Sequence, residues 1–320
     1  MAGAGAAVSG GMTTSKQAAV DTSNRFRGCL LGLACGDAVG TSVEFRSRGA
    51  FPLLTDMTGG GPFYLQAGQW TDDTSMALCL ATSLVESRGF DASDQMQRYW
   101  DWYRHGYLSS TGRCFDIGNT VRQALHRYRE TGDPFSGSTD PYTAGNGSIM
   151  RLAPVVMAYF PKAQRIWQFT AESSRTTHAA AECLDACRLL GDILYRLLSG
   201  VDKSDALLGT SPERFASKLI QAIARGDYRP KREEEIRGSG YVVECLEAAL
   251  WCFWATDSLE SAILKAANLG DDADTTAAVC GQVAGALYGA DGIPGHWLVQ
   301  LAMREEITEL AIKLQAIKLS

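Results

Sequence analysis

Two stretches of this chain carry glycine at every fourth position, and this feature limits the fold more than any other. The glycines are Gly28, Gly32, Gly36 and Gly40 in the first stretch, and Gly281, Gly285 and Gly289 in the second. Residues four apart share one face of an α-helix, so each stretch is predicted to be a helix with one face free of side chains. Because glycine weakens a helix, that face must gain from close approach to another backbone. We expect both helices to pack deep in the core and to bring their flanking loops together.

Two acidic clusters stand about two hundred positions apart, each after a glycine-containing loop and before a helical apolar pattern. They are Thr71-Asp72-Asp73-Thr74 and Asp271-Asp272-Ala273-Asp274-Thr275. Asp and Thr are favoured at helix starts, so each cluster is alternatively a helix cap. Capping uses one side-chain oxygen per helix end, however, and leaves the surplus carboxylates unexplained. If the clusters meet, a divalent cation bound through oxygen is the usual reason, and a two-metal hydrolase is predicted.

The remaining periodicity predicts an all-α protein. Helical patterns are expected over residues 25–40, 75–86, 91–107, 119–131, 148–159, 162–173, 178–198, 212–224, 241–255, 258–268 and 294–319, whereas sustained alternation typical of strands is absent. The loops at 49–70, 131–147 and 225–240 are expected to form the walls of a cleft. No change in composition divides residues 25–320, which we predict to be one catalytic domain.

Residues 1–24 differ from the rest of the chain, since they are rich in Ala, Gly, Ser and Thr and contain no aromatic residue. We expect a disordered leader or an extension that contacts a partner, with Asn24 capping the first helix.

Composition excludes several classes of function. The net charge is −6 with no long basic run, which argues against duplex nucleic acid as a partner. No apolar run reaches the ~18 residues of a membrane helix. Nine cysteines without a CxxC pair argue against structural zinc and against a disulfide framework. We therefore predict a reducing compartment, the cytoplasm.

Further candidate residues stand at loops and helix starts. Glu44 follows the first glycine helix, where it is a metal ligand, a base or an exposed glutamate. Gly145-Asn146-Gly147-Ser148 is predicted to open a helix, and such a turn presents backbone N–H groups to an anion. Asp116, His178 and Tyr241 have ordinary explanations as a capping, a packing and a loop residue.

Taken in order, these motifs resemble the ADP-ribosylglycohydrolase family. They are Gly-Asp-x-x-Gly-x-x-x-Glu, Thr-Asp-Asp-Thr, Asp-x-Gly-Asn-Thr, Gly-Asn-Gly-Ser-x-Met-Arg, Thr-His and Gly-Asp-Asp-x-Asp-Thr, between about Arg25 and Tyr288. Gly-Tyr-Val-Val at 240–243 adds similarity to the dinitrogenase reductase-activating branch. The resemblance implies a compact, orthogonal multi-helix fold and a cleft that holds ADP-ribose and two divalent cations, Mg²⁺ or Mn²⁺.

The resemblance also implies roles for individual residues. The metal shell would be Glu44, Thr71, Asp72, Asp73, Asp272, Asp274 and Thr275, whereas Asp271 is not carried over. Gly145, Asn146, Gly147 and Ser148 would hold the diphosphate or distal ribose, His178 the phosphate or terminal ribose, and Tyr241 the adenine. Glu44 or an aspartate of the clusters, such as Asp72 or Asp274, would take a proton from water. Asp116 matches an acid of arginine-specific relatives and would pair with the guanidinium group.

The predicted function is therefore removal of ADP-ribose from modified proteins, by hydrolysis of the N-glycosidic bond to arginine. Hydrolysis of O-linked, serine-attached ADP-ribose is an alternative. A catalytically silent ADP-ribose-binding or toxin-neutralising protein is another, although the intact acidic set argues against lost catalysis. A terpenoid-type enzyme is excluded, because Thr74, Ser75 and Met76 follow Asp72 and Asp73 where a DDxxD spacing needs a third acid.

Overall fold

The computed structural model describes residues 13–319 of the chain, and side chains from Thr22 onward. Within that part the regular structure is helical, and β-pairing is limited to isolated bridges, so the all-α prediction is confirmed. The helices are α1 Thr13–Gly40, α2 Asp72–Glu86, α3 Ala92–His105, α4 Asn119–Thr131, α5 Ala153–Tyr159, α6 Ala163–Arg175, α7 Ala181–Leu198, α8 Lys203–Leu208, α9 Lys218–Arg225, α10 Val242–Trp254, α11 Leu259–Ala267, α12 Ala273–Tyr288, α13 Gly295–Gln300 and α14 Arg304–Ala316.

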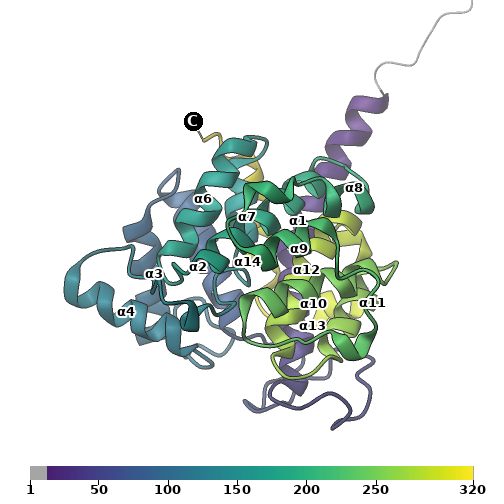
Figure 1. Ribbon diagram of the computed structural model, residues 1–320, viewed down its shortest axis with the longest axis horizontal. Helices are drawn as coiled ribbons and strands as arrows, with labels where there is room; N and C mark the ends of the chain where they lie inside the picture. Colours follow the sequence, from purple (N-terminus) through teal and green to yellow (C-terminus); the bar gives the residue numbers. More distant parts are fainter. Residues whose placement is uncertain (1–12, 320) are drawn as a thin grey trace, which may run out of the picture.

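Helices α1 and α12 are packed backbone against backbone in the middle of the fold (Figure 1). A Cβ atom on Gly32 would overlap the carbonyl oxygen of Gly281, and one on Gly281 would overlap the carbonyl oxygen of Gly32. Gly28 meets Gly285 in the same way, so the pair is antiparallel. The predicted close approach of each glycine face to another backbone is confirmed, and any side chain at these positions would force the helices apart.

The antiparallel arrangement sets the position of the acidic clusters. At the far end of the pair, Gly40 lies against the backbone of Ala273 and Asp274. The last turn of α1 therefore stands beside the first turn of α12, where the second cluster begins. The short 3₁₀ turn η1 (Thr41–Val43) continues α1 directly to the buried Glu44.

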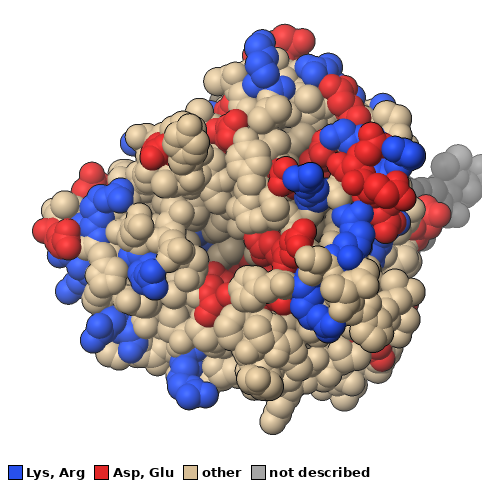
Figure 2. Space-filling view, turned by 60° about the horizontal axis from the view of Figure 1, so that its bottom comes forward, with Lys and Arg blue, Asp and Glu red and all other residues tan. Residues whose placement is uncertain are grey.

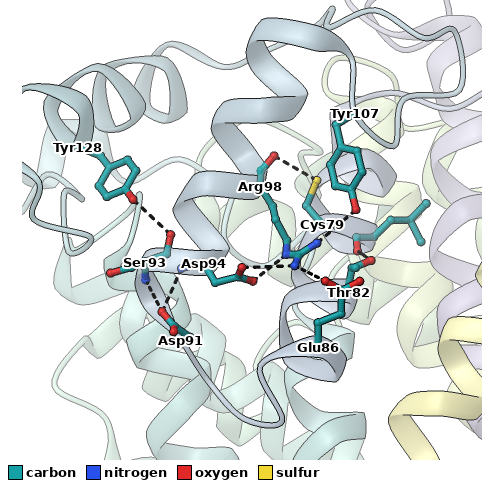
Figure 3. Close-up of polar contacts among 10 residues, drawn as sticks. Cys79, Thr82, Glu86, Asp91, Ser93, Asp94, Arg98, Tyr107 and Tyr128 are labelled. Atoms are coloured by element: carbon teal, nitrogen blue, oxygen red, sulfur yellow. Dashed lines mark hydrogen bonds and ion pairs between the residues drawn. The ribbon is translucent and has the colours of Figure 1, made fainter.

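Helix α2, which begins at the first cluster, is held against α3 by a charged network (Figure 3). The Arg98 guanidinium donates to the Glu86 carboxylate at 2.6 Å and to the Asp94 carboxylate at 2.7 Å. Asp91 caps α3 by accepting hydrogen bonds from the backbone N–H groups of Ser93 and Asp94. Of these contacts, the Arg98–Glu86 pair joins α3 to the C-terminal end of α2, opposite the acidic end of α2.

The first helix starts earlier than the sequence predicts. Asn24 was expected to cap it, but α1 begins at Thr13 and Asn24 lies inside it. The Asn24 side chain instead accepts a hydrogen bond from the backbone N–H of Asp291 at 3.2 Å. Residues 13–24 contain neither glycine nor proline, which permits a continuous helix whose first turns extend beyond the body (Figure 1). Residues 1–12 of the expected leader lie outside the described residues.

Further helix boundaries differ from expectation, and the helix expected at 212–224 begins only at Lys218. The helix expected at 148–159 begins at Ala153, and α8 was not predicted. The segment 294–319 is divided into α13 and α14 by Met303, whose backbone has φ 54°. No helix in the described part of the chain is both long enough and apolar enough to cross a membrane.

Substitution of Gly32 tests whether the glycine contact holds the fold together. Gly32→Ala places a methyl group against the backbone of Gly281, which cannot move without its helix. We expect a loss of about 3 kcal/mol or more, the upper part of the range for overpacked cores. Gly295→Ala is the matched control, because no atom lies within 4 Å of its added Cβ and it should change stability by under about 1 kcal/mol. Urea unfolding midpoints measure both effects, and equal midpoints would refute the tight contact.

Candidate functional site

The two acidic clusters form one site. The Thr71 hydroxyl lies 3.3 Å from a carboxylate oxygen of Asp274 and donates to it. The Thr275 hydroxyl donates in turn to Asp73 at 3.1 Å. Each contact joins the first turn of α2 to the first turn of α12, across some two hundred residues. The prediction that the clusters meet is confirmed.

Asp37, on the glycine helix α1, caps α2 from outside. Its carboxylate accepts hydrogen bonds from the backbone N–H groups of Thr71 and Thr74, at 2.8 and 2.9 Å. The hydroxyl groups of both threonines donate to it as well, at 2.9 and 2.6 Å. The capping requirement of α2 is therefore met by a third element. Sequence reasoning missed this role, although Asp37 belongs to the quoted Gly-Asp motif.

The capping alternative for the clusters is accordingly wrong. Thr71, at the N-cap of α2, makes no side-chain cap bond, nor does Asp272 at the N-cap of α12. The Asp272 carboxylate instead accepts from the Asn146 side-chain amide at 2.8 Å. Because Asp37 supplies the cap, the carboxylates of Asp72 and Asp73 are left for another purpose.

Two groups of carboxylates in this site are close enough to share an ion. Asp37, Asp73 and Asp274 form one group, and Glu44, Asp116 and Asp274 the other; within each, one oxygen per residue lies within 4.8 Å of the others. Asp274 belongs to both groups, and its buried Oδ1 has no hydrogen-bond partner. A buried carboxylate oxygen without a partner is costly, and a cation would supply one.

Burial and mutual repulsion leave these carboxyl groups far more basic than usual. Burial, joined by the charges of neighbouring carboxylates, raises the pKa values of Asp72, Asp73 and Asp274 well above their ordinary range. The same causes raise the pKa of Glu44 to about 10 and that of Asp116 to about 7. The site must take up protons or cations, and hard divalent ions such as Mg²⁺ and Mn²⁺ match an all-oxygen donor set.

The carboxylates lie at a cleft of about 370 Å³, and Figure 2 shows acidic side chains beside a hollow in this face. The predicted site residues that line it are Glu44, Asp72, Asp116, Gly145, Asn146, Gly147, His178, Asp272, Asp274 and Thr275. No lysine or arginine is among the described residues that line the cleft. Thr71 and Asp73 are fully buried and do not line it.

Gly145 and Gly147 form one wall of the cleft, and a buried arginine contacts the backbone of this wall. The Arg151 guanidinium donates to the carbonyl oxygen of Gly147 and, at 2.6 Å, to the Thr177 hydroxyl. It also lies over the ring of Tyr99, 4.9 Å from the centroid. Arg151 is fully buried, and sequence reasoning assigned it no role, although it ends the quoted Gly-Asn-Gly-Ser-x-Met-Arg motif.

His178 packs directly against the same wall. A Cβ atom on Gly147 would lie only 2.7 Å from the ring Cε1 of His178, so glycine is required there. Burial, with the nearby Arg151 charge, lowers the pKa of His178 to about 3, and the ring is neutral. The predicted contact of His178 with phosphate would therefore be a hydrogen bond and not an ion pair.

One expectation about this wall is wrong. Gly145–Ser148 was predicted to open a helix, but α5 begins only at Ala153, so no helix dipole points from the glycine turn into the cleft. Gln282 of α12 fixes the intervening turn, because it accepts from Ala153 N–H and donates to the carbonyl oxygens of Ile149 and Met150. The Ser148 hydroxyl accepts from the Cys187 thiol at 3.4 Å and is not part of the cleft lining.

Tyr241 lies beside the cleft without lining it. Its backbone forms a bridge with Gly145, and its hydroxyl donates to the Glu182 carboxylate of α7 at 2.6 Å. Stacking of this ring on adenine stays a prediction.

Asp116 lies among the acidic groups and does not cap α4. The N-cap of α4 is Gly118, which makes no side-chain cap bond. Asp116 has φ 60°, a conformation that is uncommon outside glycine. Its carboxyl group shares a cluster with Glu44 and Asp274, and it therefore adjoins both the cleft and the candidate cation site.

The comparisons with known proteins agree on one family. The profile of the family described as ADP-ribosylglycohydrolase matches residues 18–319. An ADP-ribosylarginine hydrolase named Tri1, from Serratia proteamaculans, is 47% identical over 91% of this chain and 79% of its own length. The ADP-ribosyl-[dinitrogen reductase] glycohydrolase of Rhodospirillum rubrum is 33% identical over 88% of this chain and 92% of its own. A solved ADP-ribosylglycohydrolase-related protein complex superposes with a TM-score of 0.84 at 42% identity, covering 93% of this chain and 99% of that one.

Metal binding at the acidic site should depend on pH. Because the folded state holds these carboxyl protons more tightly than the unfolded state, the metal-free protein should lose stability as the pH rises from about 4 through 6 and 7, where Asp37 and Asp116 ionise. A cation replaces those protons, so its affinity should increase over the same range. We expect Mg²⁺ or Mn²⁺ to raise the melting temperature more at pH 8 than at pH 5.5. The increment should disappear in Asp274→Asn, and an equal increment in the variant would count against this site.

Proposed function

This chain belongs to the ADP-ribosylglycohydrolase family, and from that premise we propose that it hydrolyses the N-glycosidic bond between ADP-ribose and arginine in modified proteins. One observation carries the proposal: acidic residues, Asp116 among them, line the cleft, and no lysine or arginine is among its described lining residues. The Serratia and Pseudomonas putida relatives, both 47% identical, are ADP-ribosylarginine hydrolases by name.

We propose that the predicted ligands hold two divalent cations; of their carboxylates, those of Glu44, Asp73 and Asp274 belong to the two close groups described above. The full set of predicted ligands is Glu44, Thr71, Asp72, Asp73, Asp272, Asp274 and Thr275. The oxygen of Asp274 that has no hydrogen-bond partner supports this assignment. Bound there, Mg²⁺ or Mn²⁺ would supply Lewis acidity toward a water molecule and the ribose hydroxyl groups.

The chain's own side chains would then perform three tasks. The carboxylates at the cleft floor stabilise the positive charge that develops on the ribose ring as its bond to nitrogen breaks. Gly145, Asn146 and Gly147 line the cleft where the remainder of ADP-ribose would lie. A carboxylate would accept the proton of the attacking water, and the candidates that line the cleft are Glu44, Asp72, Asp116 and Asp274.

Asp116 would also determine the linkage that is cleaved. Arginine carries its positive charge in a planar group that matches a carboxylate in charge and geometry. Serine-linked ADP-ribose has no charge at this point, and it would gain nothing from the acid. We therefore expect arginine to be the preferred attachment.

The direct test compares ADP-ribosyl-arginine with an ADP-ribosyl-serine peptide, each with Mg²⁺, with Mn²⁺ and with a chelator. We expect faster release of ADP-ribose from arginine, and loss of both activities in the chelator. Faster cleavage of the serine linkage would contradict the proposed substrate, and undiminished activity in the chelator would contradict the cation site.

Asp116→Asn separates recognition of arginine from the other roles of this residue. If Asp116 contacts the guanidinium group, the variant should lower kcat/KM for ADP-ribosyl-arginine at least tenfold and leave the dissociation constant of ADP-ribose nearly unchanged. If Asp116 is chiefly a cation ligand, calorimetry should show that Mn²⁺ and ADP-ribose binding weaken together. Asp94→Asn, on α3 and outside the cleft, controls for the loss of one half-buried carboxylate.

Location and partners complete the proposal. In the described part of the chain all nine cysteines are free, which is typical of a reducing compartment, and we place the protein in the cytoplasm. Its partner would be a protein carrying ADP-ribosylated arginine, and residues 1–24 would provide an additional contact.

A further inference from the structure

Three aromatic rings form a row beside the cleft. The ring centroids of Phe45 and Phe63 are 6.4 Å apart, and those of Phe63 and Phe115 are 5.1 Å apart. We call these three residues the aromatic rim. Phe45 also lines the cleft, yet it is 67% exposed, so it stands at the entrance. Because Phe45 follows Glu44 and Phe115 precedes Asp116, the rim is continuous with the acidic site.

The position of the rim is fixed by the same loops that shape the site. Phe45 has φ 61°, which is rare for a bulky side chain and persists only where surrounding contacts hold it. Its backbone N–H donates to the carbonyl oxygen of Asp271 at 2.8 Å, and the backbone N–H of Asp271 donates to the carbonyl oxygen of Arg46, also at 2.8 Å. The loop before α12 therefore holds the Phe45 ring at the cleft entrance.

Two basic residues that follow Phe45 are engaged elsewhere. Arg46 lies over the ring of Phe51 and donates to the carbonyl oxygen of Ala50. Arg48 donates to the backbone of Glu233 and Ile236. The rim therefore offers uncharged aromatic surface, and the adjacent Tyr64 is 91% exposed. The loop between η1 and α2 lies at the bottom of Figure 1, and the lower part of Figure 2, which faces the same side, is largely free of charged side chains.

We propose that the aromatic rim, extended by Tyr64, binds apolar side chains that flank the modified arginine in the protein substrate. This inference rests on the proposed function. A cleft of about 370 Å³ has the size of a small-molecule site, so the polypeptide attached to ADP-ribose stays outside it, at the entrance. Exposed aromatic surface beside such an entrance is typical of an interaction site, and the acidic cleft disfavours an acidic segment there.

The test compares three substrates: free ADP-ribosyl-arginine, and two peptides whose ADP-ribosyl-arginine is flanked by leucines or by glycines. We expect the wild type to cleave the leucine peptide about tenfold more efficiently, through KM. Phe63→Ser should remove this preference and leave kcat/KM for free ADP-ribosyl-arginine unchanged, since Phe63 contacts the other two rings without lining the cleft. Phe63→Leu should restore most of the preference. Together the variants and peptides form a double-mutant cycle.

Two further variants distinguish a direct contact with the peptide from a general effect of changing an exposed residue. Tyr64→Ser removes a side chain too exposed to support the core, and it should reduce the preference severalfold. Val299→Ser, 79% exposed on α13, should not change it. Equal cleavage of both peptides by the wild type would overturn the inference, as would an equal loss on all three substrates in Phe63→Ser. No cleavage of free ADP-ribosyl-arginine would instead overturn the proposed function, and this inference with it.

Discussion

The contact between α1 and α12 is the constraint on which the site depends. Gly32 and Gly281 allow the two backbones to touch, and at the end of the same pair Gly40 lies against Ala273 and Asp274. The first turn of α12 is thereby placed beside the last turn of α1, within reach of Asp37 and Glu44. A wider separation would move whole helices, and the carboxylates at their ends would no longer meet.

A second consequence is that the protein gathers carboxyl groups at a cleft whose described lining residues include no lysine or arginine. The Asp37 carboxylate accepts hydrogen bonds from the backbone at the start of α2. Asp72, Asp73 and Asp274 remain buried, and their pKa values are strongly raised. Such a cluster opposes folding at neutral pH unless ions bind. Cation binding, catalysis and stability are therefore expected to be linked in this protein, since one set of carboxylates serves all three.

Much of this arrangement could be predicted from the sequence, because the signals were local. Glycine at every fourth position indicates a helix face and a close partner, and the surplus acids at Asp72, Asp73 and Asp274 indicate more than a cap. The helical class followed from periodicity alone. These features depend on residues near one another in the chain, and the structure places them as expected.

The remainder required the three-dimensional structure. The cap supplied by Asp37 spans 34 residues, and the turn before α5 is fixed by Gln282, more than 120 residues away. Neither partner can be identified from local propensity. The position of Asp116 among the carboxylates, and the support of Gly147 by Arg151, also arise from contacts between distant segments. Local pattern and the family resemblance therefore indicated most residues of the cleft, whereas long-range contacts gave their geometry and added Asp37 and Arg151.

Anomalous diffraction from crystals grown with Mn²⁺ would show whether the acidic site binds cations, because it locates the ions without reference to activity. We expect anomalous peaks between the first turns of α2 and α12, in contact with Asp274 and its neighbouring carboxylates. The same peaks should be absent from crystals of Asp274→Asn. Peaks confined to the protein surface, or none near Asp274 at saturating Mn²⁺, would contradict the claim that the glycine-packed helices assemble a cation site.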